Sequence, residues 1–276
     1  MLLKLKKKSM LPKINSSSMK KILLTLSVFV LLLVVFSSPV SANHSWGGYH
    51  WARTANPFTL KLGDNLSPNW KPFLATASAD WSTSTILDTT IVTGQGGKNC
   101  KATNGRVEVC NRKYGNNGWL GIAQIWITGG VHITQGVTKM NDTYFGKPAY
   151  NTPAWKQMVM CQEVGHTLGL DHQDEIFDNS NLGTCMDYTS DPSTNQHPNQ
   201  HDYDELDTIY SHLDSFTTIG QASGQVTRQL GQLAANQDLN NPGEWGRSIR
   251  DNGKVAIFER DLGLGNKVFT FVIWAK

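Results

Sequence analysis

The sequence predicts an α/β fold of the α+β kind, preceded by a targeting segment. Between Phe58 and Lys139, short runs either alternate apolar and polar residues or are rich in β-branched residues, and both patterns are typical of strands. Longer segments near residues 70–83, 153–168 and 203–213 carry helix signals instead. The chain has 39% hydrophobic and 17% charged residues, a globular composition that excludes disorder over most of its length.

The first strands are expected on either side of one helix. Residues 58–62 alternate apolar and polar side chains and residues 86–92 are β-branched, so each segment predicts a strand. The helix between them, near residues 70–83, starts after Pro68 and has apolar residues at helical spacing: Phe73, Leu74, Ala77 and Trp81. The glycine-rich segment 94–99 lacks the Gly-Lys-Ser/Thr sequence and the helix of a phosphate loop, so a simple loop is expected.

Two further stretches predict strands in the middle of the chain. Residues 106–110 alternate apolar and polar side chains. Residues 119–139 are rich in Ile, Val, Thr and Trp, and Gly129 and Gly130 interrupt them. This stretch predicts two strands, or one strand with a bulge or turn at the glycines.

Two helices and a hairpin complete the predicted elements. Thr152 as N-cap and Pro153 at the first helical position start a helix that runs to about Leu168 and stops at Gly169. After the polar segment 171–198, a last helix has apolar residues at helical spacing: Tyr203, Leu206, Ile209, Tyr210 and Leu213. Asp202 and Asp204 favour the N-terminus of that helix electrostatically. The hairpin has strands 255–262 and 268–274 around a turn at 263–266.

The first 42 residues predict a secretory signal peptide. Lysines precede an apolar run of fifteen residues, Ile22–Phe36, and Val40-Ser41-Ala42 forms a cleavage site of small residues. The run is shorter than the roughly 20 residues that span a bilayer. We therefore expect a secreted, extracellular protein with no membrane attachment after cleavage, and an uncleaved anchor is the alternative. Met19 would begin a signal of ordinary length.

The charge distribution excludes a nucleic-acid partner. The formal charge is +3, but seven of the 25 basic residues lie in the first 42 positions, which contain no acidic residue. The remaining 18 basic groups face 22 acidic groups, so the exported part carries about −4. The basic excess belongs to the signal segment and not to a binding surface.

Four cysteines in an exported chain predict two disulfides. Cys100, Cys110, Cys161 and Cys185 allow three pairings, and proximity in sequence favours Cys100 with Cys110 and Cys161 with Cys185. Free buried thiols are the alternative. A four-cysteine zinc site is disfavoured because no pair has the short spacing that such sites use.

The segment Cys161-Gln162-Glu163-Val164-Gly165-His166-Thr167-Leu168-Gly169-Leu170-Asp171-His172 carries the chemistry. On a helix, residues 162 and 166 lie one turn apart on the same side, and Glu163 sits beside that face. Gly169 ends the helix and lets the chain turn His172 back toward the same point. This is the layout of a zinc hydrolase, which needs three protein ligands, an open position for water and a carboxylate to take the proton of that water.

The segment resembles the zinc signature H-E-x-x-H-x-x-G-x-x-H of the metzincin metallopeptidases, with the matrixin branch closest in layout. Glu163, His166, Gly169 and His172 match the base, the second ligand, the turn glycine and the third ligand. Cys185-Met186-Asp187-Tyr188 resembles the Met-turn of that clan. The resemblance implies that Met186 lies beneath the metal, and that Tyr188 acts as an extra ligand or a transition-state donor.

The resemblance also implies a fold and a domain division. It covers roughly residues 58–216 and implies a twisted mixed sheet, a backing helix, the active-site helix, the Met-turn and a C-terminal helix. Residues 43–216 would be the metallopeptidase domain, and 217–276 a small extension with the hairpin. In such folds the segments around Cys161 and Cys185 pass close together beneath the metal. An edge strand within residues 123–134 would hold the substrate by strand addition.

Gln162 departs from the metzincin pattern, because it stands where the first ligand histidine is expected. Its neutral amide oxygen is a poorer zinc donor than an imidazole nitrogen. Gln162 would ligate weakly in an active enzyme, or another ligand would complete the site: Asp171, His44, His50, His132 or a water. A site without metal, or with His166 and His172 as merely buried polar residues, also remains open.

The resemblance thus implies a secreted zinc endopeptidase that hydrolyses peptide bonds of a protein or peptide substrate. Its Zn²⁺ would be held by Gln162, His166 and His172, with a metal-bound water and Glu163 as general base. Tyr188 would steady the oxyanion. The alternative is an extracellular binding protein that kept the fold and lost the chemistry, for which Gln162 is the main argument.

Overall fold

The computed structural model describes residues 43–220 and 239–275. The predicted signal peptide, at 1–42, lies outside the described residues. Across the two described ranges, every helix is too short or too polar to cross a bilayer.

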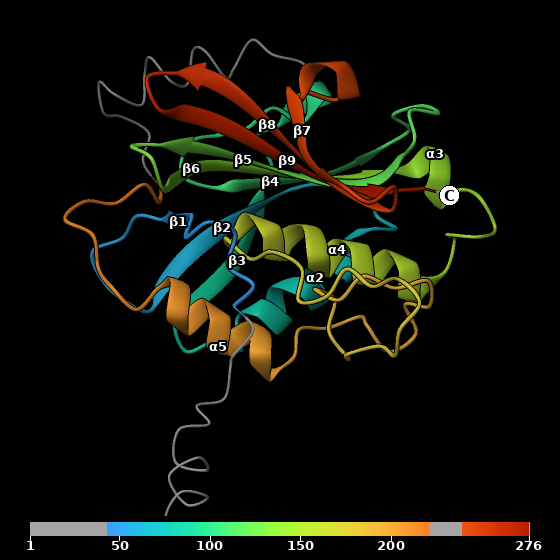
Figure 1. Cartoon of the computed structure of the whole chain (residues 1–276), viewed down its shortest axis with the longest axis horizontal. Helices are drawn as coiled ribbons and strands as arrows, with labels where there is room; N and C mark the ends of the chain where they lie inside the picture. The colour runs from blue at the N-terminus through green and yellow to red at the C-terminus, as the bar shows by residue number, and fades with distance from the viewer. Residues whose placement is uncertain (1–42, 221–238, 276) are drawn as a thin grey trace, which may run out of the picture. The chain divides into compact units, whose positions relative to one another are not determined.

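A mixed sheet organises the described part of the chain (Figure 1). Its strand order is β3-β2-β4-β6-β5-β9-β8-β7, and the short strand β1 pairs with β6. Neighbours from β3 to β6 run parallel, and neighbours from β6 to β7 run antiparallel. The strands are β1 (His50–Trp51), β2 (Phe58–Asn65), β3 (Leu87–Thr93), β4 (Val107–Arg112), β5 (Trp119–Thr128), β6 (His132–Asn141), β7 (Arg247–Asp251), β8 (Val255–Gly263) and β9 (Asn266–Trp274).

Helices cover one face of the sheet. Helix α4 (Pro153–Thr167) packs on β5 and β6, and α2 (Lys71–Trp81) packs on α4 and β3. Helix α5 (Gln200–Ile209) lies on the far side of this helical layer in Figure 1, and α3 (Asp142–Phe145) is a single turn after β6. Short 3₁₀ turns occur at Gly97–Asn99 and Pro242–Glu244. The α+β prediction is confirmed.

The central strand β5 buries apolar side chains on both faces of the sheet, because each face is covered there. On β5, Ile125 and Ile127 belong to the main core beneath the helices. Ile122 and Trp126 face the other way, into a second core closed by Leu239 and Trp245. Alternate side chains of one strand therefore enter different cores, as the pleat of a strand requires. This explains why the sequence of β5 is apolar almost throughout.

The local sequence signals place most element ends well. Gly129 and Gly130 form the turn between β5 and β6, so the two-strand alternative is correct. The side chain of Thr152 accepts a hydrogen bond from the Trp155 amide at the start of α4. Gly169 follows the end of α4 with a φ of +99°, and a side chain there would collide with the Tyr49 carbonyl.

The last helix begins earlier than predicted and ends earlier. Asn199 caps α5 and forms a capping box with Asp202, so the first turn is polar and has no apolar periodicity to reveal it. Helical structure stops at Ile209, four residues before Leu213, which is exposed. Asp202 lies in the first turn, as predicted for a residue that favours the helix N-terminus.

The predicted hairpin is present as β8 and β9, and it joins the main sheet. Strand β9 pairs antiparallel with β5, and β7 adds a further strand beyond β8. The expectation of an edge strand within residues 123–134 is therefore wrong, because β5 is paired on both sides. Local sequence patterns identify strands but not their partners, so the sequence does not predict this pairing.

Candidate active and metal centre

Helix α4 and the turn after it bring His166 and His172 together. Their Nε2 atoms are 3.2 Å apart, and the rings meet edge to face with centroids 4.7 Å apart. In a tetrahedral zinc site, bonds of about 2.0–2.1 Å place two imidazole nitrogens about 3.3–3.4 Å apart. The pair has the spacing of two ligands on one zinc ion.

The partners of the two histidines fix which nitrogens are free. His166 Nδ1 lies 2.9 Å from the Leu170 carbonyl, and His172 Nδ1 lies 3.1 Å from a Glu175 carboxylate oxygen. Both oxygens only accept, so each Nδ1 carries the proton. The two Nε2 lone pairs then face one another, an arrangement that a cation between them stabilises. Such outer partners are the usual support of metal-binding histidines.

Burial favours the neutral form of the His166 imidazole. Its side chain is 1% exposed, and burial lowers its pKa well below 6.5, helped by the nearby His172. The imidazole is therefore neutral near pH 7, which is the form that binds metal. Glu175 supports the neighbouring ligand: burial acts to raise its pKa, but the hydrogen bond from His172 and the charge of Arg250 outweigh it and lower the pKa.

Gln162 and Glu163 are fully buried and unsatisfied. Neither polar atom of Gln162 and neither carboxylate oxygen of Glu163 has a hydrogen-bond partner. Leaving a buried polar group unpaired costs about 1–3 kcal/mol. A cation next to Gln162 and His166 would satisfy the amide oxygen, so the orphaned atoms fit a metal centre. We call Gln162, Glu163, His166 and His172 the α4 centre.

Burial also raises the pKa of Glu163 well above 4.5. A carboxyl with a raised pKa suits proton transfer near neutral pH. Glu163 reaches this position because Gly121 of β5 has no side chain: a Cβ there would lie 2.7 Å from Glu163 Oε1 and 2.5 Å from Val159. The missing side chain on the strand makes room for the carboxyl.

The alternative ligands considered from the sequence lie elsewhere. Within the described residues, no His, Cys, Asp or Glu joins His166 and His172 in a group of three close ligand atoms. Asp171 lies on the Nδ1 side of His172, at 3.8 Å, and pairs with Arg250. The remaining candidates have other carboxylate partners: His44 pairs with Asp202, and His50 and His132 pair with Asp214. Gln162, by contrast, has no hydrogen-bond partner.

The predicted Met-turn segment runs against α4. Met186 is fully buried, and a Cβ at Gly165 would lie 2.6 Å from its sulfur. A disulfide between Cys161 and Cys185, with Cα atoms 5.9 Å apart, ties this segment to the helix. The second disulfide joins Cys100 and Cys110 across 6.1 Å. Both are the pairings that sequence proximity favours.

Tyr188 lies near the centre, but its hydroxyl is engaged. The ring is 6.3 Å from that of His172, and the hydroxyl donates a 3.0 Å hydrogen bond to the Lys254 carbonyl, between β7 and β8. Burial raises its pKa, with a smaller contribution from Tyr150. A pocket of about 240 Å³ adjoins it, lined in part by Trp155, Phe177, Tyr188 and Trp274.

The C-terminal strands cover the α4 centre. Phe271 of β9 stacks on His166, with centroids 4.4 Å apart and planes 10° apart. Arg250 of β7 forms ion pairs with Asp171 and, at 3.1 Å, with Glu175. In the same region Gln162 and Glu163 are 0% exposed, and His172 is 7% exposed. The sequence identified the hairpin but gave no signal that Phe271 and Arg250 reach this centre.

Comparison with known proteins gives only a weak likeness. No protein-family model and no curated protein sequence matches the chain. Two solved structures of myroilysin are similar to it, each with a TM-score of 0.34, at 11% and 10% sequence identity. The match covers 58% and 64% of this chain and 82% and 97% of those chains. A likeness at this level supports no assignment, so a function must rest on the geometry of the α4 centre.

Proposed function

We propose that the chain is a secreted zinc-dependent endopeptidase of the metzincin type, held latent by its own C-terminal strands. One observation carries the proposal: the Nε2 atoms of His166, on α4, and His172, just after it, lie 3.2 Å apart, and the same helix carries the buried and unpaired Gln162 and Glu163. A structural role for the histidines alone leaves these two side chains unexplained. The predicted signal peptide and the two disulfides support an extracellular location.

The residues present fit a zinc ion. His166 and His172 would bind it through Nε2, and Gln162 through its side-chain oxygen. A zinc ion with an open position polarises a carbonyl group and lowers the pKa of water toward 7. The neutral amide of Gln162 makes the centre weaker than one with three imidazoles.

Glu163 moves the proton in the proposed reaction. Its carboxylate accepts a proton from the water that attacks the scissile carbonyl, and it returns that proton to the leaving amine nitrogen. The pKa raised by burial makes the carboxylate a stronger base, which favours the uptake of the proton. Once the Tyr188 hydroxyl is released from the Lys254 carbonyl, it donates a hydrogen bond to the developing oxyanion.

The covering strands must move before a peptide can enter. Strand β9 occupies the edge of β5 on which an extended peptide would otherwise add as a strand. Phe271 occupies the space over His166, and Arg250 holds β7 to Asp171 and Glu175. We therefore propose that the protein is latent as folded here and that release of β7 and β9 activates it.

The test compares three forms of the zinc-loaded full chain on casein and a broad peptide library. Arg250→Ala removes the ion pairs to Asp171 and Glu175 and should raise hydrolysis about tenfold. This corresponds to roughly 1.4 kcal/mol, near the lower end for hydrogen bonds to charged groups. Arg247→Ala is the matched control, because Arg247 lies on the same strand but pairs with Glu259 of β8. It should leave hydrolysis unchanged.

Adding Glu163→Gln to the Arg250→Ala chain should abolish hydrolysis and leave zinc bound. If the double variant cleaves as well as Arg250→Ala, Glu163 is not the base and the proposed mechanism is wrong. If Arg250→Ala binds zinc and still cleaves nothing, the alternative holds. In that case the chain is an extracellular binding protein, and Gln162 marks a centre that has lost its chemistry.

A further inference from the structure

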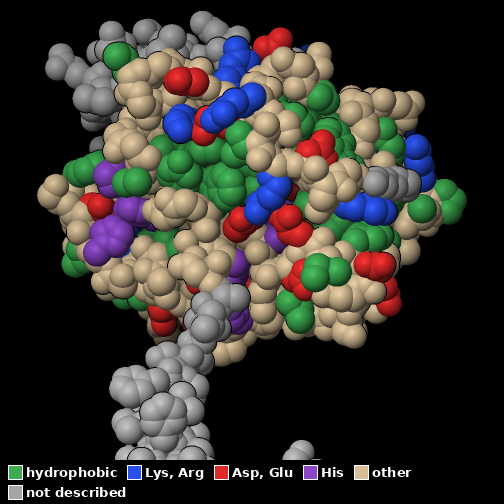
Figure 2. Space-filling view, viewed as in Figure 1, with side chains coloured by type: hydrophobic (Ala, Val, Ile, Leu, Met, Phe, Trp, Pro, Cys, Tyr) green, Lys and Arg blue, Asp and Glu red, His purple; other side chains and the backbone are tan. Residues whose placement is uncertain are grey.

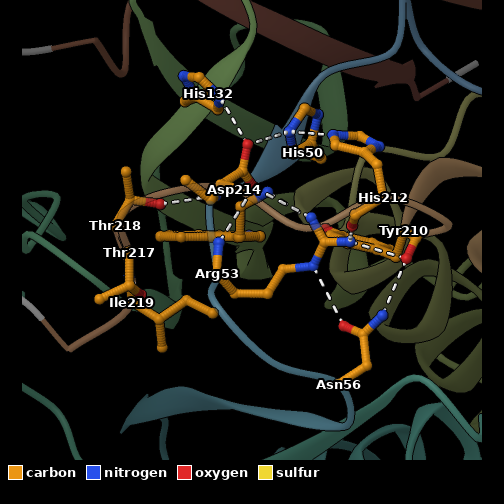
Figure 3. A network of polar contacts seen from close by, with 12 residues as sticks. His50, Arg53, Asn56, His132, Tyr210, His212, Asp214, Thr217, Thr218 and Ile219 are labelled. Carbon is orange, nitrogen blue, oxygen red and sulfur yellow. Dashed lines mark hydrogen bonds and ion pairs between the residues drawn. The ribbon is translucent and has the colours of Figure 1, made fainter.

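A second group of histidines gathers far from α4 in the sequence. His50 comes from β1, His132 from the start of β6, and His212 and Asp214 from the segment after α5. Their side chains converge in Figure 3, and Figure 2 shows histidines grouped at the end of the molecule where β1 lies. The proposed peptidase mechanism uses none of these residues.

The ligand atoms of this group lie close enough together to share one metal ion. His50 Nε2 lies 3.2 Å from His212 Nε2 and 3.6 Å from Asp214 Oδ1. Ligand atoms of these two histidines and of Asp214 all lie within 4.8 Å of one another. The edges of a tetrahedral zinc site with bonds of about 2.0–2.1 Å are about 3.3–3.4 Å long. Three side chains thus offer two imidazole nitrogens and one carboxylate to a single point.

The hydrogen bond of its Nδ1 places the lone pair of His50 on Nε2. His50 Nδ1 lies 2.8 Å from the Gly48 carbonyl, which only accepts, so Nδ1 is protonated in the neutral ring and Nε2 carries the lone pair. That lone pair faces the Asp214 carboxylate. Without a metal, the Nε2–H of His212 satisfies His50. Metal binding would require His212 to carry its proton on Nδ1 instead, which leaves its Nε2 lone pair for the metal.

Hydrogen bonds also fix the orientation of the Asp214 carboxylate. Its Oδ2 accepts from the amide and the guanidinium of Arg53, both at 3.1 Å. Its Oδ1 accepts from His132 Nε2 at 3.1 Å and faces His50. One oxygen is therefore fixed by a cation and the other turned toward the histidines. Partners of this kind orient ligands in established metal sites.

The group also has an entrance. His50 is 4% exposed, whereas His212 is exposed at the surface. A metal can reach the three ligands from solvent on the side of His212, and water can fill its remaining position. Two imidazoles and one carboxylate form a donor set suited to zinc.

We propose that His50, His212 and Asp214 bind one zinc ion, with His132 as a positioning residue that orients Asp214. The ion would join β1 to the segment after α5. We call these four residues the His212 centre. The proposal does not depend on the α4 centre being an enzyme.

The experiment measures the zinc content and zinc affinity of the full chain after loading and desalting. His212→Ala should lower the content by one zinc per chain, whether or not the α4 centre is filled, and should remove one tight phase from a calorimetric titration. The substitution is at an exposed position, so folding should persist. His197→Ala is the matched control, because His197 is an exposed histidine that pairs with Asp80 and belongs to neither centre. It should leave the content unchanged.

Two further variants separate ligand from positioning roles. Asp214→Asn should lower zinc affinity at this centre at least a hundredfold. His132→Gln should keep the stoichiometry and lower affinity about tenfold, as loss of an outer partner does. Equal zinc content in the wild type and His212→Ala would overturn the proposal.

Discussion

The α4 centre and the His212 centre have similar geometry and opposite access to solvent. Each has two Nε2 atoms 3.2 Å apart, and in each at least one histidine is held by a carbonyl through Nδ1. The α4 centre lies beneath Phe271, with side chains that are 0–7% exposed. The His212 centre reaches the surface.

The polar surroundings of the two centres differ as well. Asp214 is balanced by Arg53 and two histidines. Burial acts to raise its pKa, but the hydrogen bond from the Arg53 amide and the histidines outweigh this and lower it. Gln162 and Glu163 have no such partners. The His212 centre reaches the surface and its polar atoms are paired, so it is suited to a structural metal. The α4 centre is buried and holds unpaired polar groups of the kind that catalysis uses.

The largest expected difference is in metal exchange. Zinc at the His212 centre should pass directly to a chelator, whereas zinc at the α4 centre must wait for β7 and β9 to open. If that opening costs about 4 kcal/mol, release should be about a thousandfold slower. Mixing the loaded chain with a coloured chelator should give two phases. Arg250→Ala should accelerate only the slow phase; equal acceleration of both would break the comparison.

Loss of one disulfide should affect zinc binding at the two centres differently, and this is the next largest effect. Replacing Cys161 and Cys185 by alanine opens a loop of 25 residues, counting both cysteines, and should cost roughly 3 kcal/mol. It should also weaken zinc at the α4 centre and leave the His212 centre unchanged. The matched control replaces Cys100 and Cys110, whose loop of 11 residues contributes about 0.7 kcal/mol less. Denaturant unfolding with zinc titration tests both, and equal zinc loss in both pairs would contradict the assignment.

A substitution at Gly169 should affect zinc binding at both centres. Its φ is +99°, and an alanine there would push on the Tyr49 carbonyl, next to His50. Gly169→Ala should cost about 2–3 kcal/mol and weaken zinc at both centres. Gly183→Ala is the control, because φ is +73° but the space around a Cβ is empty. It should cost about 1–2 kcal/mol from backbone strain alone and affect neither centre.

Short-range signals explain what the sequence could predict. Thr152 and Pro153 start α4, Gly169 ends it, and the two glycines at 129–130 turn the chain between β5 and β6. Each signal depends on backbone geometry within a few residues, so it is legible in the sequence. The juxtaposition of His166 and His172 follows from the same local geometry, since a helix end and one turn separate them.

Long-range contacts explain what the sequence could not predict. His50 and His212 are separated by 162 positions, and no spacing rule connects them. His50 was a candidate ligand for the α4 centre only because its partners were unknown. The pairing of β9 with β5 is similar: the hairpin pattern identifies two strands, and the free edge it joins is set by tertiary packing. The sequence alone therefore does not show that β7 and β9 cover the α4 centre.

The smallest and most specific expected effect concerns Gln162. If its amide oxygen binds zinc, Gln162→His should strengthen zinc at the α4 centre by roughly tenfold, because imidazole nitrogen is the better donor. The His212 centre serves as an internal reference in the same titration and should not change. In the Arg250→Ala background hydrolysis should persist or increase, since Glu163 is untouched. Unchanged zinc affinity at the α4 centre would show that residue 162 does not reach the metal. The buried, unpaired amide would then need another explanation.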